Sequence, residues 1–253
     1  MAEDRILAWL LLGSWPIAFL ILFLAVDPIP QDPAFHAFAP SGAWMGVPHF
    51  WNVVSNLPLL IPGILGLRFL QRQGGLAQGK PEATFFFGLL LTALGSAYYH
   101  WAPDTETLVW DRMPMTITFM GFFLAMVAHC VSRATADRFL VPALLLGIGS
   151  VLYWAWTESL ARGDLRPYAV VQFLPLLLVA VLLLRFHPPS LRRKALWCVP
   201  LAYALAKLCE FADHAMAEVL PFALTGHAIK HLFAAAAGFA FLRAFRVPYA
   251  DEA

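Results

Sequence analysis

Apolar residues are gathered into long runs along this chain, and short polar segments separate the runs. A membrane-spanning helix needs about 20 predominantly apolar residues. By that criterion we predict eight spanning helices, at approximately 6–26, 49–70, 83–101, 114–131, 139–157, 168–186, 195–213 and 222–243. Spanning strands would alternate in polarity over about ten residues, and the sequence shows no such alternation. The pattern predicts an all-α, polytopic membrane helix bundle.

Composition agrees with lipid as the main solvent. The chain is 60% hydrophobic and 13% charged, against about 25% charged residues in a typical soluble domain. Its mean hydropathy is +0.69. The net charge of +1, with no basic stretch interleaved with aromatics, gives no indication of nucleic-acid binding. The three cysteines show neither CxxC spacing nor a disulfide framework.

The basic residues predict an orientation for the bundle. Most of the 17 lysines and arginines fall near the two ends of the chain and in alternate connectors. Because cytoplasmic loops collect basic residues, both termini are expected in the cytoplasm. The run 6–26 is too long for a signal peptide and lacks a cleavage pattern, so we interpret it as a retained helix. Short loops and no targeting extension favour a bacterial inner membrane.

Three polar clusters lie where the predicted spans meet the non-cytoplasmic side. Ser96 and His100 are four residues apart at the end of the third span, and Asp111 stands at the start of the fourth. His227 and His231, also four apart, stand in the first turns of the last span. Residues four apart share a helix face. The topology therefore brings all three clusters to one depth, facing the periplasm.

This arrangement favours a metal site. His100, His227 and His231 supply three imidazoles, and water would take a fourth position, which is the pattern of catalytic zinc. A zinc ion there would activate water for hydrolysis. Asp111 is then the candidate general base, and Ser96 the candidate donor to the developing oxyanion.

Simpler interpretations exist for each of these residues. The histidines could be interfacial and hydrogen-bonded to neighbouring helices. Ser96 could bond the carbonyl of Thr92 within its own helix. Asp111 could be a helix N-cap, with Pro114 in the first turn. The joint pattern, rather than any single residue, favours the metal site.

Other polar residues lie inside the predicted spans. Asn52, Ser55 and Asn56 form a polar face on the second span, for which interhelical hydrogen bonding is the default and a role near the site the alternative. Lys207 and Glu210 are one turn apart and could neutralise each other. Glu210 and His214 share a face and could support a metal-bound histidine.

Four segments together resemble a known family. They read FWNVVSN at 50–56, GSAYYH at 95–100, DRMPM at 111–115 and HAIKH at 227–231. Their order and spacing resemble the alkaline ceramidases, members of a membrane-hydrolase superfamily that includes the adiponectin receptors. The resemblance covers about residues 49–245.

The resemblance implies a fold and a chemistry. It implies a seven-helix core at 49–246. The extra N-terminal transmembrane helix and outer loop at 1–48 depart from the family, and a short tail follows at 247–253. The resemblance also implies zinc on His100, His227 and His231, with Ser96 and Asp111 completing the site. The implied reaction is hydrolysis of the amide bond of a ceramide-like lipid to a fatty acid and a sphingoid base.

The sequence departs from this family just before the predicted core. The family carries an acidic calcium-binding segment there and a glutamate ahead of FWN. This chain reads PSGAWMGVPHFWN, with His49 in the glutamate position. We therefore expect no calcium site of that kind and a different recognition of the lipid head group.

Two functional hypotheses follow. The leading one is a zinc-dependent intramembrane amidohydrolase whose lipid substrate enters from the bilayer. The alternative is a non-enzymatic seven-helix receptor or scaffold with a structural metal. A transporter is less favoured, because its polar site would lie near mid-bilayer rather than near one surface. The sequence gives no oligomeric state.

Overall fold

The computed structural model of the protein describes residues 2–188 and 190–245. Throughout this part of the chain the regular structure is helical, with isolated β-bridges and no strand. The predicted all-α fold is therefore confirmed. The predicted tail, 247–253, lies outside the described residues.

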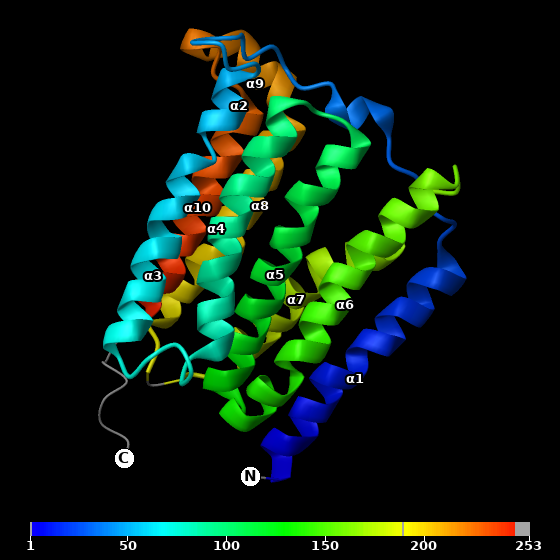
Figure 1. Cartoon of the computed structure of the whole chain (residues 1–253). Coiled ribbons are helices and arrows are strands. Elements are labelled where there is room, and N and C mark those ends of the chain that lie inside the picture. The colour runs from blue at the N-terminus through cyan, green and yellow to red at the C-terminus, as the bar shows by residue number, and fades with distance from the viewer. Residues whose placement is uncertain (1, 189, 246–253) are drawn as a thin grey trace.

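Long helices run side by side along one axis (Figure 1). They are α1 (Ala2–Ala25), α3 (Leu60–Arg72), α4 (Lys80–Trp101), α5 (Thr105–Cys130), α6 (Arg133–Ser159), α7 (Arg166–Arg185), α8 (Arg193–Phe211) and α10 (Gly226–Ala244). The shorter elements are η1 (Pro33–His36), α2 (Phe50–Val54), η2 (Leu57–Leu59), α9 (Asp213–Val219) and η3 (Pro221–Ala223). We call the end of the bundle where α2 and α9 lie the α9 end; α1 begins and α10 ends at the opposite end (Figure 1).

The length and hydropathy of the helices indicate a membrane protein. Among the described residues, four stretches are long and apolar enough to cross a membrane: Phe50–Arg72, α5, α6 and α7. The pair α8 and α9, bent by 77°, would make a fifth. The helices α4 and α10 carry ionisable side chains in or near their end turns, which lowers their hydropathy. The eight-span arrangement and its orientation stay predictions.

The start of α5 differs from the prediction. The apolar run begins at 114, but the helix begins nine residues earlier, because Asp104 caps it. Asp104 Oδ1 accepts a hydrogen bond from Thr107 N at 2.6 Å, and Thr107 Oγ1 accepts one from Asp104 N at 3.1 Å. Pro114 lies inside the helix. Interpreting Asp111 as an N-cap is therefore wrong, and its side chain is available for another role.

Glycines bring α4 and α5 into close contact. A Cβ atom on Gly95 would lie 2.0 Å from the backbone oxygen of Trp110, and one on Gly88 would lie 2.5 Å from Thr118 Oγ1. Small residues of this kind let helices approach closely in membranes, where tight packing replaces the hydrophobic effect. The contact at Gly95 fixes the depth of Ser96, its neighbour, relative to α5.

An aromatic cluster joins α10 to the same two helices. The ring of Phe241 lies 4.7 Å from that of Phe85 on α4 and 5.2 Å from that of Phe122 on α5, measured between ring centroids. All three side chains are buried. Aromatic pairs at such distances stabilise packing beyond their buried area. The cluster holds α10 against α4 and α5 below the α9 end.

Candidate metal centre

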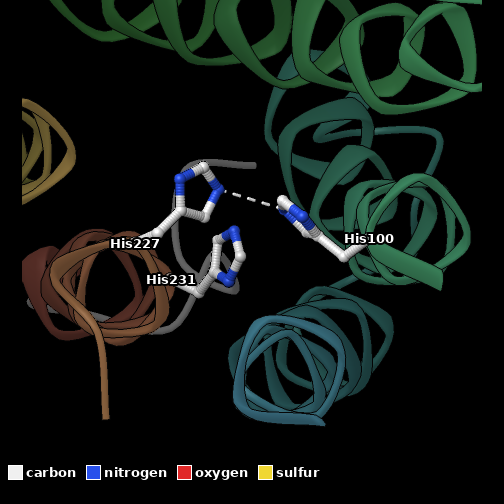
Figure 2. A group of neighbouring side chains, drawn as sticks. All are labelled: His100, His227 and His231. Atoms are coloured by element: carbon white, nitrogen blue, oxygen red, sulfur yellow. Dashed lines mark hydrogen bonds between the residues drawn. The ribbon is translucent and has the colours of Figure 1, made fainter. Parts of the chain in front are cut away.

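Three histidines from two helices meet at the α9 end. His100 lies in the last turn of α4, and His227 and His231 lie in the first two turns of α10. One potential ligand atom from each lies within 4.8 Å of the others, and all three side chains are buried. Figure 2 shows the three rings directed into one shared space. The structure thus brings together the residues that the sequence predicted as ligands.

The geometry suits a tetrahedral metal. His100 Nε2 lies 3.1 Å from His227 Nε2, and His231 Nε2 is buried with no hydrogen-bond partner in the described part of the chain. Two nitrogens on one tetrahedral zinc lie about 3.4 Å apart, given Zn–N bonds of about 2.0–2.1 Å. An orphaned ring nitrogen beside two others is costly unless a cation or a hydrogen-bond donor occupies the shared space. The cluster can therefore hold a metal ion.

Ser55 orients one of the rings. Its Oγ lies 2.8 Å from His231 Nδ1, so the opposite nitrogen, Nε2, is directed away from the serine. A metal-binding histidine commonly makes such a second hydrogen bond, which fixes its tautomer and ring orientation. The His100 ring is instead packed against the rings of Phe38 and Tyr99. This contact is an interhelical hydrogen bond, the default interpretation of the polar face on the second span, and it also places Ser55 next to the histidine cluster.

Asp213 supports the histidine cluster from a neighbouring helix, and no pattern in the sequence predicted this role. Its buried carboxylate accepts a hydrogen bond from His227 N at 2.7 Å and another from Ala39 N at 2.9 Å. Thr225 is the N-cap of α10, and its Oγ1 accepts a hydrogen bond from Ala228 N. A carboxylate at a helix N-terminus is electrostatically favourable. Asp213 therefore acts as a second cap on α10, supplied from α9.

Ser96 and Asp111 lie beside the histidines. Ser96 is one turn before His100 on α4, and Asp111 is in the second turn of α5. Both are buried, both line the same cavity as His231, and the serine hydroxyl interacts with the carboxylate. The structure therefore places both predicted catalytic residues next to the predicted ligands.

The cavity has a volume of about 220 Å³. Most of its wall is apolar and includes Leu59, Phe85, Leu89, Phe119, Phe122, Leu176, Val199, Ala234 and Ala237, but polar side chains such as Thr92, Thr118 and Gln172 also line it. From Ser96 to Phe85 the α4 helix descends eleven residues, about 16 Å at 1.5 Å per residue. The cavity thus has a polar end at Ser96, Asp111 and His231 and a mainly apolar body reaching into the bundle, which suits an amphipathic ligand.

The segment 27–48, which we call the capping segment, covers the histidines. The Phe38 ring lies 4.9 Å from the His100 ring and 4.3 Å from the His227 ring. His36 Nδ1 lies 2.9 Å from the Tyr99 hydroxyl. Burial lowers the pKa of His36, while the charge of Asp104 opposes that shift. The capping segment therefore closes the α9 end over the three histidines.

Glu210 pairs with two lysines rather than with a histidine. Its carboxylate binds Lys207 Nζ at 2.5 Å, as expected, and also Lys230 Nζ at 2.6 Å. His214 Nε2 lies 3.0 Å from the Ala37 carbonyl oxygen. The idea that Glu210 and His214 support a metal-bound histidine together is therefore wrong. The three charged residues instead form a network that lines the cavity.

No model of a known protein family matches the chain, and a search of the curated proteins gave no match either. The resemblance to alkaline ceramidases thus continues to depend on the four motifs and their order.

Proposed function

We propose that the protein is a membrane-embedded, zinc-dependent hydrolase that cleaves the amide bond of a ceramide-like N-acyl lipid to a fatty acid and an amine. The observation that carries this proposal is a cluster of three buried histidines, one of which lines a mainly apolar cavity together with a serine and an aspartate. The resemblance of the same residues to the alkaline ceramidase motifs supports it.

His100, His227 and His231 would hold the ion through three ring nitrogens, leaving a position open for reaction. When bound, zinc would polarise the amide carbonyl and supply a nucleophile from water at neutral pH. Ser55 would keep the His231 ring in place through its 2.8 Å contact with Nδ1. Asp213 would fix the backbone of His227.

Asp111 moves the proton in the proposed reaction. Its carboxylate takes a proton from the attacking water, whose oxygen forms a bond to the carbonyl carbon. The same group then gives that proton to the amine nitrogen as the carbon–nitrogen bond breaks. Its burial beside the cavity keeps the carboxylate away from bulk water, so the proton is retained between the two steps.

Ser96 has a role that changes during the reaction. Before attack its hydroxyl interacts with the Asp111 carboxylate and orients it. Once Asp111 carries a proton it no longer needs that donor, and the hydroxyl can turn toward the developing oxyanion. Donors aimed at such an oxygen in a water-poor site contribute strongly to catalysis.

The acyl chain would occupy the apolar body of the cavity. Its walls are formed by side chains of several helices, and they begin directly below the polar residues. A lipid entering from the bilayer would thus place its amide at the level of Ser96, Asp111 and His231.

We further propose that the α9 end faces the periplasm of a bacterium and that both termini are cytoplasmic. Cysteine labelling of intact cells at exposed Arg162, between α6 and α7, tests this orientation.

One observation favours the alternative, a receptor or scaffold with a structural metal: Phe38 covers two of the histidines. A covered site restricts access of water to the ion. Under that hypothesis the protein binds zinc but releases no fatty acid from any N-acyl lipid.

Three variants separate these proposals. Purified His231→Ala should lose zinc and activity, because it removes one of three ligands. Asp111→Asn should keep zinc and lose hydrolysis. His187→Ala, a change at an exposed histidine remote from the cluster, is the control and should keep both. Zinc content and fatty acid release are the readouts, and full activity in zinc-free His231→Ala protein would refute the mechanism.

A further inference from the structure

Arg112 is a buried cation that lacks a carboxylate partner. Only 6% of its surface is exposed. Its Nη2 donates to Gln31 Oε1 at 2.7 Å, whereas Nη1 is buried with no hydrogen-bond partner among the described residues. In residues 2–188 and 190–245, no aspartate or glutamate lies within ion-pair distance of it. A buried charge without a counter-ion is costly, so this guanidinium is poised for an anion.

Aromatic rings hold Arg112 in position. Its guanidinium carbon lies 4.3 Å from the Trp154 ring centroid, 5.0 Å from that of Tyr168 and 5.4 Å from that of Phe35. Cation–π contacts stabilise the charge but use none of the N–H groups. A planar guanidinium fixed in this way presents its donors in a set direction, which suits carboxylate or phosphate oxygens.

The cavity as a whole carries a surplus of positive charge. The cationic side chains in its wall are Arg112, Lys207 and Lys230, and the acidic ones are Asp111 and Glu210. Both lysines share Glu210, and Asp111 is the proposed proton carrier. The cavity that would accept the lipid therefore has one more cation than it has carboxylates.

We propose that Arg112 anchors an anion subsite, and that the lipid cleaved at the neighbouring centre carries a carboxylate or a phosphate in its polar head. The second half of this statement rests on the hydrolase function proposed above. Arg112 follows Asp111 directly on α5 and both line one cavity, so an anion bound at Arg112 shares that cavity with the amide. An N-acyl amino acid, whose carboxylate is one carbon away from the amide nitrogen, has this arrangement.

The first test compares three substrates with one acyl chain. They are N-palmitoylglycine, the phosphate ester of N-palmitoylethanolamine, and neutral N-palmitoylethanolamine, each in uncharged detergent micelles with the zinc-loaded protein. Charge-assisted hydrogen bonds to a buried partner correspond to a preference on the order of 10- to 100-fold in kcat/KM. A preference for the glycine conjugate identifies a carboxylate and one for the ester a phosphate. Equal kcat/KM values for all three substrates overturn the proposal.

Substitutions then assign the preference to Arg112. Arg112→Gln should reduce the ratio of kcat/KM for the anionic substrates to that for the neutral one toward one. Arg112→Lys keeps the charge but loses the planar, bidentate donor geometry, so it should reduce the ratio less. The control is Arg162→Gln, an exposed arginine at the same end that does not line the cavity. An unchanged ratio in Arg112→Gln protein would overturn the assignment.

A binding measurement separates this proposal from the hydrolase. His231→Ala protein, which cannot assemble the three-histidine site, is titrated with hexadecyl phosphate, hexadecanoate and hexadecanol. The anionic amphiphiles should bind at least tenfold more tightly than the alcohol, and Arg112→Gln should remove the difference. If no lipid is hydrolysed but this binding persists, the hydrolase fails and the anion subsite stands. Equal binding of all three amphiphiles refutes the subsite itself.

Discussion

Replacing Asp213 by alanine tests whether its carboxylate joins the histidine cluster to the capping segment. The side chain holds two buried N–H groups, His227 N at 2.7 Å and Ala39 N at 2.9 Å. A hydrogen bond to a charged group contributes about 1.5–3 kcal/mol. Two such bonds would give more, but burying the carboxylate has its own cost. We therefore expect Asp213→Ala to lower the free energy of unfolding by about 3 kcal/mol.

The free energy of unfolding can be measured by SDS titration of the purified protein in mixed micelles. Asp213→Asn keeps one acceptor oxygen and should lose about half as much, roughly 1.5 kcal/mol. Glu218→Ala removes an exposed carboxylate from the same α9 helix and is the matched control. It should stay within about 0.5 kcal/mol of the wild type.

Hydrogen exchange supplies a second readout for the same change. Loss of the Ala39 contact should speed amide exchange in the capping segment, while exchange in the aromatic cluster around Phe241 should stay slow. A stability loss below about 1 kcal/mol in Asp213→Ala, together with unchanged exchange at Ala39, would show that the carboxylate does not hold the two elements together.

Three further predictions concern other parts of the protein. Ser55→Ala should weaken zinc binding on the order of 10- to 100-fold, because the His231 ring loses its orienting partner; competition with a chelator of known affinity measures this, and wild-type affinity would contradict it. Gly95→Ala should cost about 1–3 kcal/mol through overpacking, whereas Gly149→Ala, where a Cβ meets nothing within 4 Å, should be nearly neutral; thermal unfolding in detergent checks the order of the two. Because burial lowers the pKa of His36, the closed capping segment should be most stable above about pH 6.5 and should loosen as the pH falls below it. Amide exchange corrected for its intrinsic pH dependence should show this, and His36→Gln should remove the effect.

Much of the centre was predictable because it depends on local periodicity and depth. The four-residue spacing of His227 and His231 places both rings on one face of α10. Hydropathy placed His100 at the matching end of its own helix. Neither inference required knowledge of how the helices pack, and the structure confirms that the three rings meet.

What the sequence did not reveal depends on contacts between helices and irregular segments. Asp213 and Ala39 are 174 residues apart, and Gln31 and Arg112 are 81 apart. No periodicity links such residues, since one partner in each pair lies outside the regular helices. The start of α5 was missed for a related reason: Asp104 caps the helix within a polar stretch, where hydropathy gives no signal.

The division of the three histidines between α4 and α10 sets an order of assembly. The α10 helix is synthesised after every other described helix. Two of the three histidines, His227 and His231, therefore enter the membrane after the rest of the bundle. Domains form broadly in the order in which they are made. The site therefore does not exist while the bundle is being inserted. An ion that binds all three rings would join α10 to α4, so metal binding and helix docking would stabilise each other.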